Sequence, residues 1–190
     1  LMIGCSDMGT GCDTILAQMA ADCLGCEYDN IIVRGVDTDQ SPYDSGSYAS
    51  STTYVTGMAV VKACEQMKSR ICEEAAPLMG LAPNEVEFDG ALISEKKDPE
   101  HFMELADLVT SLQAGSGKII TAAASNTSNV SPPPFMAGAA EVEIDLETGK
   151  VTPIDYAAVV DCGTVINSNL ARVQTEGGLV QGIGMALYED

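Results

Sequence analysis

The chain contains no tryptophan, a single histidine, and only nine lysine and arginine residues among its 190 positions. Set against 28 aspartate and glutamate residues, these basic residues leave a formal net charge of −19. A protein that grips a phosphate backbone or an anionic membrane surface needs clusters of basic side chains, and the sequence has none. The composition therefore excludes nucleic acid and anionic membranes as main partners.

Long hydrophobic runs are also missing, and no charged-then-apolar leader opens the sequence. The seven cysteines are an odd number, which is typical of reduced thiols and predicts a cytoplasmic protein. What the chain does have is 46% hydrophobic residues, enough to build a buried core and to argue against disorder.

Only Cys23 and Cys26 have the spacing of a metal-binding or redox pair. A zinc or iron–sulfur site would need a second pair at similar spacing, and the lone histidine, His101, offers no substitute. We interpret both cysteines as small buried residues at the end of a helix. A thiol redox pair is the alternative interpretation.

Hydrophobic periodicity predicts an α+β fold in which strands and helices alternate. Helices are expected at residues 14–24, 51–76, 99–112 and from 168 to the end. Strands are expected at residues 2–5, 30–36, 86–93 and 118–123, with a hairpin over 139–162.

A polar, proline-rich connector at residues 126–134 is the best candidate for an internal boundary. We expect two small α/β lobes, residues 1–131 and residues 132–190, the second made of the hairpin and a glycine-rich helix. The chain opens within an expected strand and closes within an expected helix. We therefore expect a fragment whose first lobe is truncated at its start and whose second lobe is truncated at its end.

Gly9, Thr10 and Gly11 lie between the first expected strand and the first expected helix. Glycines there let the backbone turn sharply and approach a ligand, and free N–H groups at a helix start favour an anion. An ordinary strand-to-helix turn is the alternative, and the third glycine of a dinucleotide fingerprint is missing.

A second candidate site precedes the long helix. Residues 45–53 supply six serine and threonine hydroxyls, although capping one helix needs only one. Backbone donors and the helix dipole also favour negative charge at this position. The excess of hydroxyls favours a ligand contact around Ala49, Ser50, Ser51 and Thr52.

Gln174 stands in the last expected helix, which also contains four glycines at positions 177, 178, 182 and 184. Each helical glycine costs about 1 kcal/mol relative to alanine, so another element or a ligand is expected close to the backbone. Tight helix packing alone would explain Gly182 and Gly184. A buried amide such as that of Gln174 requires a hydrogen-bond partner.

The sequence VVDCGTVIN at residues 159–167, followed by QTEGGLVQGIGMALYE at 174–189, resembles the molybdopterin-binding subunit of the xanthine dehydrogenase and aldehyde oxidase family. The segment 8–11 with Thr14, and the segment 50–53 with Gly57, resemble the same family in the same order. Each motif is short, but the ordered set spans nearly the whole chain.

The resemblance implies part of a molybdenum hydroxylase that oxidises purines, aldehydes or N-heterocycles and takes its oxygen from water. It implies molybdenum–molybdopterin as cofactor, in a mono- or dinucleotide form. It further implies 2Fe–2S clusters and FAD on partner domains or subunits, and contact with the remainder of the molybdenum subunit. The substrate would be a small molecule, and a homodimer is a possible oligomeric state. A non-catalytic scaffold fragment that binds subunits and no cofactor is the alternative.

The same resemblance implies which residues contact the cofactor. They are Gly9, Thr10, Gly11, Ala49, Ser50, Ser51, Thr52 and Gln174. Thr10 stands where the family usually has glutamine, so its shorter side chain changes that contact. The family's catalytic glutamate belongs to a motif that this sequence does not contain. We therefore expect no catalytic residue and no metal ligand in the chain, and no activity from the fragment alone.

Overall fold

A computed structural model describes residues 1–189 and divides the chain into two compact units. The first unit is Leu1–Asn129 and the second is Val130–Asp190. The division falls within the expected proline-rich connector, after residue 129 instead of residue 131. Each unit has its own elements and is described by itself.

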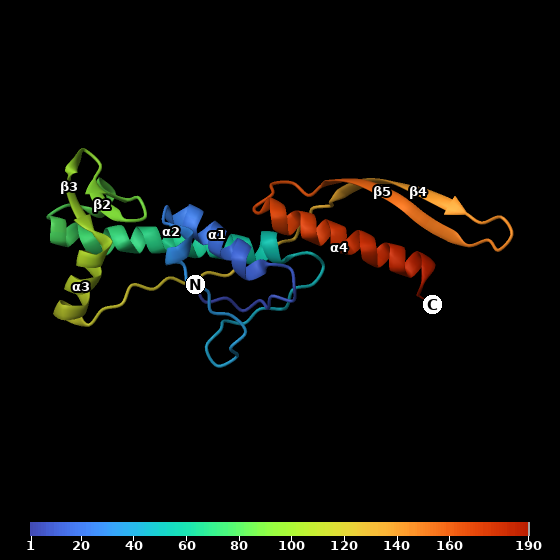
Figure 1. Ribbon diagram of the computed structural model, residues 1–190. Coiled ribbons are helices and arrows are strands. Elements are labelled where there is room, and N and C mark those ends of the chain that lie inside the picture. Colours follow the sequence, from blue (N-terminus) through green and yellow to red (C-terminus); the bar gives the residue numbers. More distant parts are fainter. Residues whose placement is uncertain (190) are drawn as a thin grey trace. The chain divides into compact units, whose positions relative to one another are not determined.

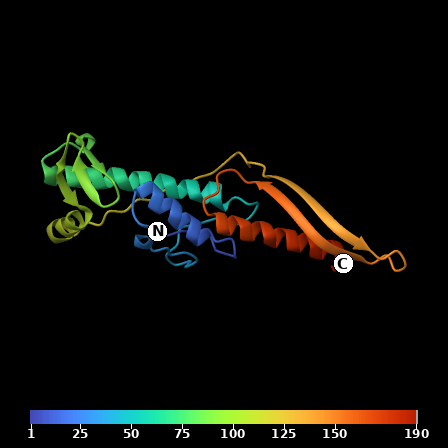
Figure 2. The same ribbon diagram turned by 45° about the horizontal axis from the view of Figure 1, so that its top comes forward.

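Two helices carry the first core of unit 1. α1 (Cys12–Leu24) and α2 (Thr52–Met79) run side by side (Figures 1 and 2). α1 ends at Gly25 and α2 at Gly80, both in the left-handed conformation that glycine adopts without a steric penalty. The buried residues of this core are Ile3, Cys5, Cys12, Leu16, Ala20, Val60 and Cys64.

The second core of unit 1 lies against the C-terminal half of α2. It combines α3 (Leu105–Ser116) with an antiparallel sheet of order β1-β2-β3. The strands are β1 (Val86–Phe88), β2 (Leu92–Glu95) and β3 (Asp98–Glu104). The buried residues are Ile71, Ala75, Ala76, Val86, Phe88, Ile93 and Leu108. The 28-residue helix α2 therefore contributes to both cores and links them.

Several predicted elements of unit 1 are wrong. The strands expected at 2–5 and 30–36 reduce to a single parallel bridge between Met2 and Arg34. The strand expected at 118–123 does not form, because no described strand pairs with it. α2 continues through Pro77 to Met79, beyond the expected end at residue 76, and stops at Gly80. Proline disrupts only one intrahelical hydrogen bond, and here it lies in the last turn of the helix.

The helix expected at 99–112 is correct only in its second half. Residues 98–104 form β3, in which Phe102 pairs with Ser94 and Glu104 pairs with Leu92. The helix α3 begins at Leu105, directly after the last paired residue. The local helical pattern extends further back, but β2 offers this segment antiparallel pairing of its backbone, with a register shift between Ser94 and Glu95.

The segment after α3 lies along α2 without forming a strand. Arg70 donates a hydrogen bond to the Thr121 carbonyl, and Lys118 Nζ lies 2.6 Å from Glu74 Oε1. Further along, Lys62 Nζ donates to Asn126 Oδ1 at 2.6 Å. Side chains from α2 therefore hold a stretch that belongs to no strand.

Unit 2 confirms the expected hairpin and last helix. β4 (Phe135–Ile144) pairs antiparallel with β5 (Val151–Asp161), and α4 (Ser168–Leu187) follows. In the turn, Asp145 Oδ1 accepts a hydrogen bond from the Glu147 N–H at 2.9 Å, and Gly149 has a φ of 72°. At the start of α4, the Asn167 side chain caps the helix by accepting from the Leu170 N–H.

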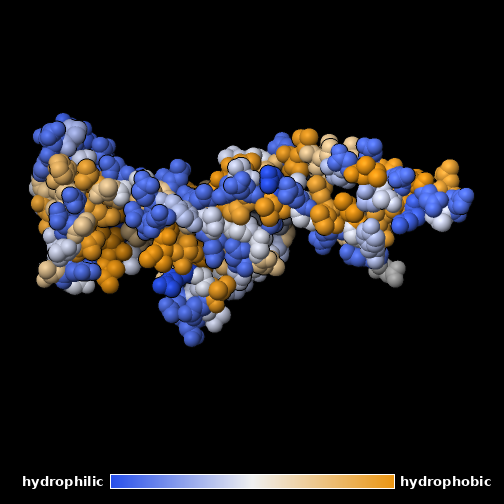
Figure 3. All heavy atoms as spheres, viewed as in Figure 1, coloured by the Kyte–Doolittle hydropathy of each residue, from blue (hydrophilic) through white to orange (hydrophobic). Residues whose placement is uncertain are grey.

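No described residue of unit 2 is buried. Every position of β4 is exposed, and α4 has no buried side chain. Large apolar side chains such as Phe135, Ile154 and Val180 are more than half exposed, and hydrophobic surface is visible over the hairpin in Figure 3. A two-stranded hairpin with both faces exposed is marginally stable in water, so unit 2 lacks a core of its own.

Candidate functional site

The N-termini of α1 and α2 lie at the same end of unit 1, because the two helices are parallel. Gly57, early in α2, lies against Leu16 and Met19 in the middle of α1. Further along, Cys23 Sγ lies 3.8 Å from the Val61 carbonyl oxygen. Two parallel helix dipoles therefore place their positive ends near each other, an arrangement that negative charge at that end stabilises.

Two loops that the sequence singled out lead into these two helix starts, and they contact each other. Ser47 Oγ donates to the Ser6 carbonyl oxygen at 3.2 Å. A Cβ atom added to Gly4 would lie 2.2 Å from the Pro42 carbonyl oxygen, so only glycine fits there. The structure thus brings the segment before Gly9 to the segment before Ser50.

The first loop, residues 6–11, is organised by the Asp7 carboxylate. Asp7 Oδ1 accepts hydrogen bonds from the Gly9 N–H at 2.9 Å and from the Gly11 N–H at 3.1 Å. Both glycines have positive φ angles, 100° and 74°, which turn their N–H groups toward the carboxylate. The sequence predicts that the backbone N–H groups of this loop bind an external anion. In the structure, the N–H groups of Gly9 and Gly11 instead donate to a side chain of the same loop.

The Asp7 pKa lies below its ordinary value. Partial desolvation raises it, but hydrogen bonds from the backbone N–H groups of Gly9, Gly11, Asp13 and Thr10 outweigh that effect. Asp7 is therefore a carboxylate near neutral pH, and its negative charge lies at the N-terminus of α1.

Thr10, between the two glycines, has an unusual hydroxyl. Its Oγ1 is buried and meets no hydrogen-bond partner of standard geometry among the described residues, although this hydroxyl partly offsets the burial that raises the pKa of the neighbouring Cys12 thiol. A buried hydroxyl without a partner costs free energy, which a ligand contact would recover. Thr10 is the only residue of the described chain with such a side-chain atom.

The second loop has strained backbone and an open helix start. Ala49 and Ser50 both adopt positive φ angles, 52° and 55°, which are uncommon outside glycine. Ser51 directs its hydroxyl back to the Tyr48 carbonyl at 2.7 Å, so it does not cap α2. α2 therefore begins without a side-chain cap from its N-cap residue.

Asp44 fixes the second loop to α2. Its Oδ1 accepts from the Gly46 N–H at 2.8 Å, and its Oδ2 accepts from Thr56 Oγ1 at 3.3 Å. Both carboxylate oxygens thus make hydrogen bonds within unit 1. Sequence reasoning missed Asp44 and Asp7 as organising residues, although an aspartate two residues before a glycine is a signal for such a turn.

The thiols near the two loops are protonated. Burial, followed by the neighbouring Cys12 thiol, raises the pKa of Cys5 to about 12. Burial also raises the pKa of Cys12. Asp7, Cys12 and Asp13 have their ligand atoms within 4.8 Å of one another, but a thiol that resists ionisation is a poor metal ligand. We therefore do not assign a metal ion to this cluster.

The expected Cys23–Cys26 pair has a different neighbour. Cys23 interacts with the Cys64 thiol of α2, and burial raises the pKa of both thiols, that of Cys64 to about 11. A redox-active cysteine needs an accessible thiolate, which burial disfavours here. The packing of Cys23 between α1 and α2 supports the structural interpretation.

Gln174 belongs to unit 2, on α4, and its side chain is exposed. The expectation that this amide is buried is therefore wrong for the described chain. Space around the helix is also open, because a Cβ atom on Gly177, Gly178 or Gly182 would meet no atom within 4 Å. The expected close packing at Gly182 does not occur within the described residues.

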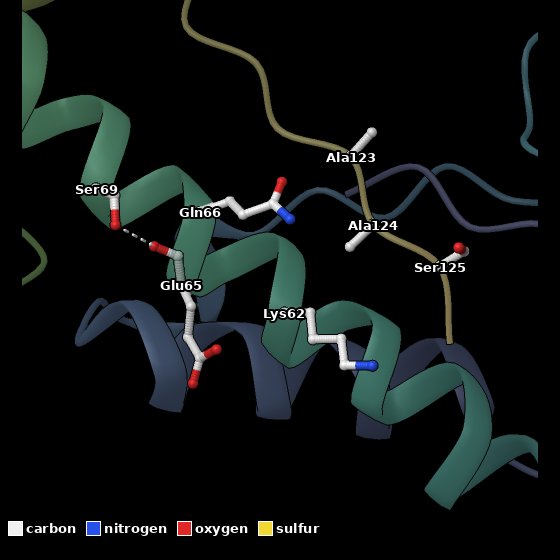
Figure 4. A pocket seen from close by; sticks show the side chains of 7 residues that line it. All are labelled: Lys62, Glu65, Gln66, Ser69, Ala123, Ala124 and Ser125. Atoms are coloured by element: carbon white, nitrogen blue, oxygen red, sulfur yellow. Dashed lines mark hydrogen bonds between the residues drawn. The ribbon is translucent and has the colours of Figure 1, made fainter. Parts of the chain in front are cut away.

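A shallow groove that the sequence did not indicate lies between α2 and residues 123–125. Its volume is about 510 Å³, and Figure 4 shows its polar side chains on α2 and its small residues on the facing segment. The lining residues are Lys62, Glu65, Gln66, Ser69, Ala123, Ala124 and Ser125. The Ser69 hydroxyl bonds to the Glu65 carbonyl of its own helix.

Comparison with known proteins identifies the family. The model of the molybdopterin cofactor-binding domain matches residues 1–190. The chain belongs to this family. It is 30% identical, over 98% of its length, to the xanthine dehydrogenase molybdenum-binding subunit of Escherichia coli O157:H7, of which it covers 25%. The nicotine 6-hydroxylase large subunit of Paenarthrobacter nicotinovorans is also 30% identical, with 98% of this chain and 24% of the relative covered.

Solved structures share the family's fold. The Cu,Mo-CO dehydrogenase matches with a TM-score of 0.73 and 29% identity, over 93% of this chain and 23% of that one. Quinoline 2-oxidoreductase from Pseudomonas putida 86 matches with a TM-score of 0.73 and 29% identity, over 94% and 24%. These matches confirm the predicted α+β cofactor-binding fold. The chain spans about a quarter of the length of the curated relatives it matches.

No helix within residues 1–189 combines the length and the apolar character needed to cross a membrane. The cytoplasmic location expected from the cysteines stays a prediction.

Proposed function

We propose that the chain forms part of the cofactor site of a molybdenum hydroxylase that oxidises purines, aldehydes or N-heterocycles. In this proposal the cofactor contacts are made by Gly9, Thr10, Gly11, the residues Ala49 to Thr52, and Gln174. The observation that carries the proposal is the uncapped start of α2 beside a loop with a buried, unpartnered hydroxyl. Membership of the family supports it.

The residues fit this group chemically. The N–H groups at the start of α2 and the Ser50 and Thr52 hydroxyls are donors for the negatively charged phosphate of the cofactor. The Thr10 hydroxyl can donate to or accept from the pterin ring. When bound, the molybdenum–pterin group supplies the oxidation of a substrate carbon with water as the oxygen source. 2Fe–2S clusters and FAD on partner domains or subunits would accept the electrons.

The chain's own residues bind and orient the cofactor in this proposal, and none is assigned as the catalytic base. Asp7 and Asp44 make hydrogen bonds within their own loops. Glu176, beside Gln174, pairs with Arg172 at 3.2 Å on the exposed surface of α4. A base must lie within hydrogen-bond reach of the proton it removes. We therefore propose that the catalytic base belongs to the remainder of the molybdenum subunit.

The test measures molybdenum and pterin in the purified full-length subunit, expressed with its partner subunits. Removing one hydrogen bond to a charged group costs about 1.5–3 kcal/mol. A Ser50→Ala/Thr52→Ala double variant and a Gln174→Ala variant should therefore lose most of their molybdenum and pterin. Thr110→Ala is the matched control, because that hydroxyl bonds to the Ala106 carbonyl within α3. Wild-type metal and pterin content in both test variants would refute the site.

The isolated 190-residue chain should purify without molybdenum and show no hydroxylase activity. A scaffold role without cofactor is the second candidate, and the exposed apolar surface of unit 2 favours it. Full-length subunit that assembles with its partners but never contains pterin would decide for the scaffold.

A further inference from the structure

The segment of unit 1 that follows α3 has the side-chain pattern of a β-strand but belongs to no sheet. Along residues 120–126, half-buried and exposed side chains alternate strictly. The half-buried residues are Ile120, Ala122, Ala124 and Asn126. Figure 4 shows the same alternation, with the Ala124 side chain directed toward α2 and that of Ala123 directed away from it. A period of two is typical of an extended strand, whose successive side chains point to opposite faces.

Side chains and backbone of α2 hold this segment in place. The Arg70 guanidinium donates to the Thr121 carbonyl oxygen. Before it, Lys118 Nζ lies 2.6 Å from Glu74 Oε1, and after it, the Asn126 amide donates to a backbone carbonyl of α2 at 3.2 Å. Ordering an extended backbone costs conformational entropy. Because α2 already orders the segment, a partner strand would meet a preorganised surface.

The two edges of the segment differ. In an extended strand, the backbone N–H and C=O groups of one residue point to one side and those of the next residue to the other. Arg70 contacts the edge that includes Thr121. The other edge, called the open edge below, carries the N–H and C=O groups of Ile120, Ala122 and Ala124. Backbone–backbone hydrogen bonds among the described residues include none from residues 119–125. Such a row of donors and acceptors is a template for pairing with another strand.

We propose that residues 119–125 form a strand of a sheet that is completed by an extended segment from the remainder of the molybdenum subunit. Pairing takes place along the open edge, in the manner of β-strand addition. Ile119, whose side chain is 76% exposed, packs against an apolar residue of the incoming strand. Beyond Ile119, the outward side chains of Thr121, Ala123 and Ser125 are small, so they leave room for that strand.

Two observations favour this partner over a second copy of the chain. The chain covers only 25% of the xanthine dehydrogenase molybdenum-binding subunit that it matches, and a segment of the same polypeptide is present at high effective concentration. Two copies of a chain with a net charge of −19 repel each other. The inference rests on the proposed function for the identity of the polypeptide that supplies the strand.

The first experiment measures amide hydrogen–deuterium exchange, resolved to single residues, in the purified full-length subunit. The amides of Ile120, Ala122 and Ala124 should exchange at least about 100-fold more slowly than those of an unstructured peptide, because they donate to the incoming strand. A segment that only connects α3 to unit 2 would exchange rapidly at all three positions. That result would overturn the inference.

Ala122→Pro and Ala123→Pro separate the two edges. Proline removes one backbone N–H and is compatible with an extended backbone. Ala122→Pro removes a donor from the open edge, so exchange at Ile120 and Ala124 should rise about tenfold, which corresponds to the loss of one hydrogen bond. Ala123→Pro is the matched control and should leave these two amides near wild type. Equal exchange in the two variants would count against pairing along the open edge.

Cross-linking identifies the partner without relying on a proline variant. A photoreactive benzophenone amino acid replaces Ile119 in the full-length subunit, assembled with its partner subunits. Irradiation should join position 119 to a residue of the same polypeptide outside residues 1–190. The same group in place of Lys97, which is exposed in the turn between β2 and β3, is the control and should not reach that segment.

A cross-link from position 119 to residues 130–190, to a second copy or to a partner subunit would overturn the assigned partner, as would no cross-link at all. Molybdenum and pterin content provides a separate readout. A subunit that shows the expected cross-link but contains no pterin would refute the proposed function and leave the strand pairing established.

Discussion

The Ser47 hydroxyl donates a hydrogen bond to the backbone carbonyl oxygen of Ser6 at 3.2 Å. This contact joins two segments that lie 41 residues apart in the chain. Through it, the glycine loop before α1 and the serine-rich loop before α2 become the two sides of one surface. The candidate site therefore depends on tertiary contacts as much as on its motifs.

Removing this contact should loosen the candidate site without unfolding the unit. Ser47→Ala is expected to cost about 1 kcal/mol, the usual net value of one such hydrogen bond. In the full-length subunit it should also lower molybdenum and pterin content. Ser69→Ala is the control, since that hydroxyl bonds within α2. Equal pterin content in the two variants would contradict a role of the contact in holding the site.

Gly25 and Gly80, the C-cap residues of α1 and α2, allow the cost of a close backbone approach to be measured by comparison. Both have left-handed φ angles, 83° and 72°, but a Cβ on Gly25 would lie 2.2 Å from the Asp89 carbonyl oxygen, whereas Gly80 has open space. Gly80→Ala should cost about 1–2 kcal/mol for the left-handed conformation alone. Gly25→Ala should cost about 1–3 kcal/mol more, because backbone must move. Urea unfolding measures both, and equal losses would disprove the close approach.

Alkaline pH should destabilise unit 1 through Cys5. Its pKa is raised from 9.0 to about 12 in the folded chain. A raised pKa means that the folded state holds the proton more tightly, so the contribution is complete below pH 9 and is lost as pH rises toward 12. The free energy of unfolding should therefore fall less steeply with pH in Cys5→Ala than in Cys162→Ala, whose thiol is exposed. Identical slopes would exclude this linkage.

Unit 2 should not fold by itself. A peptide of residues 130–190 has a hairpin and one helix but no buried side chain among its described residues, so little free energy opposes the loss of chain entropy. Circular dichroism should show neither a cooperative thermal transition nor a stable helix. Residues 1–129, with two hydrophobic cores, should unfold cooperatively. A cooperative transition in the short peptide would contradict this expectation.

The local sequence by itself determined the elements whose signals lie within a few residues. The helix α4 and the β4–β5 hairpin follow from hydrophobic periodicity, and the structure contains them. Residues 99–104 show where this fails. Their sequence has a helical pattern, but in the structure these residues pair with β2 and form a strand. This pairing cannot be read from the local sequence.

The ordered motifs also determined the family, because glycine, serine and glutamine residues at those positions are visible without a fold. Only the tertiary structure decided how the two loops differ. Both loops are rich in glycine or hydroxyl groups, yet one has its N–H groups occupied by Asp7, whereas in the other Asp44 bonds to Gly46 and Thr56 and the N-cap residue of α2 makes no side-chain cap. Hydrogen-bond donors are equivalent in a sequence, and the acceptor that each one meets is set by how the chain turns in space.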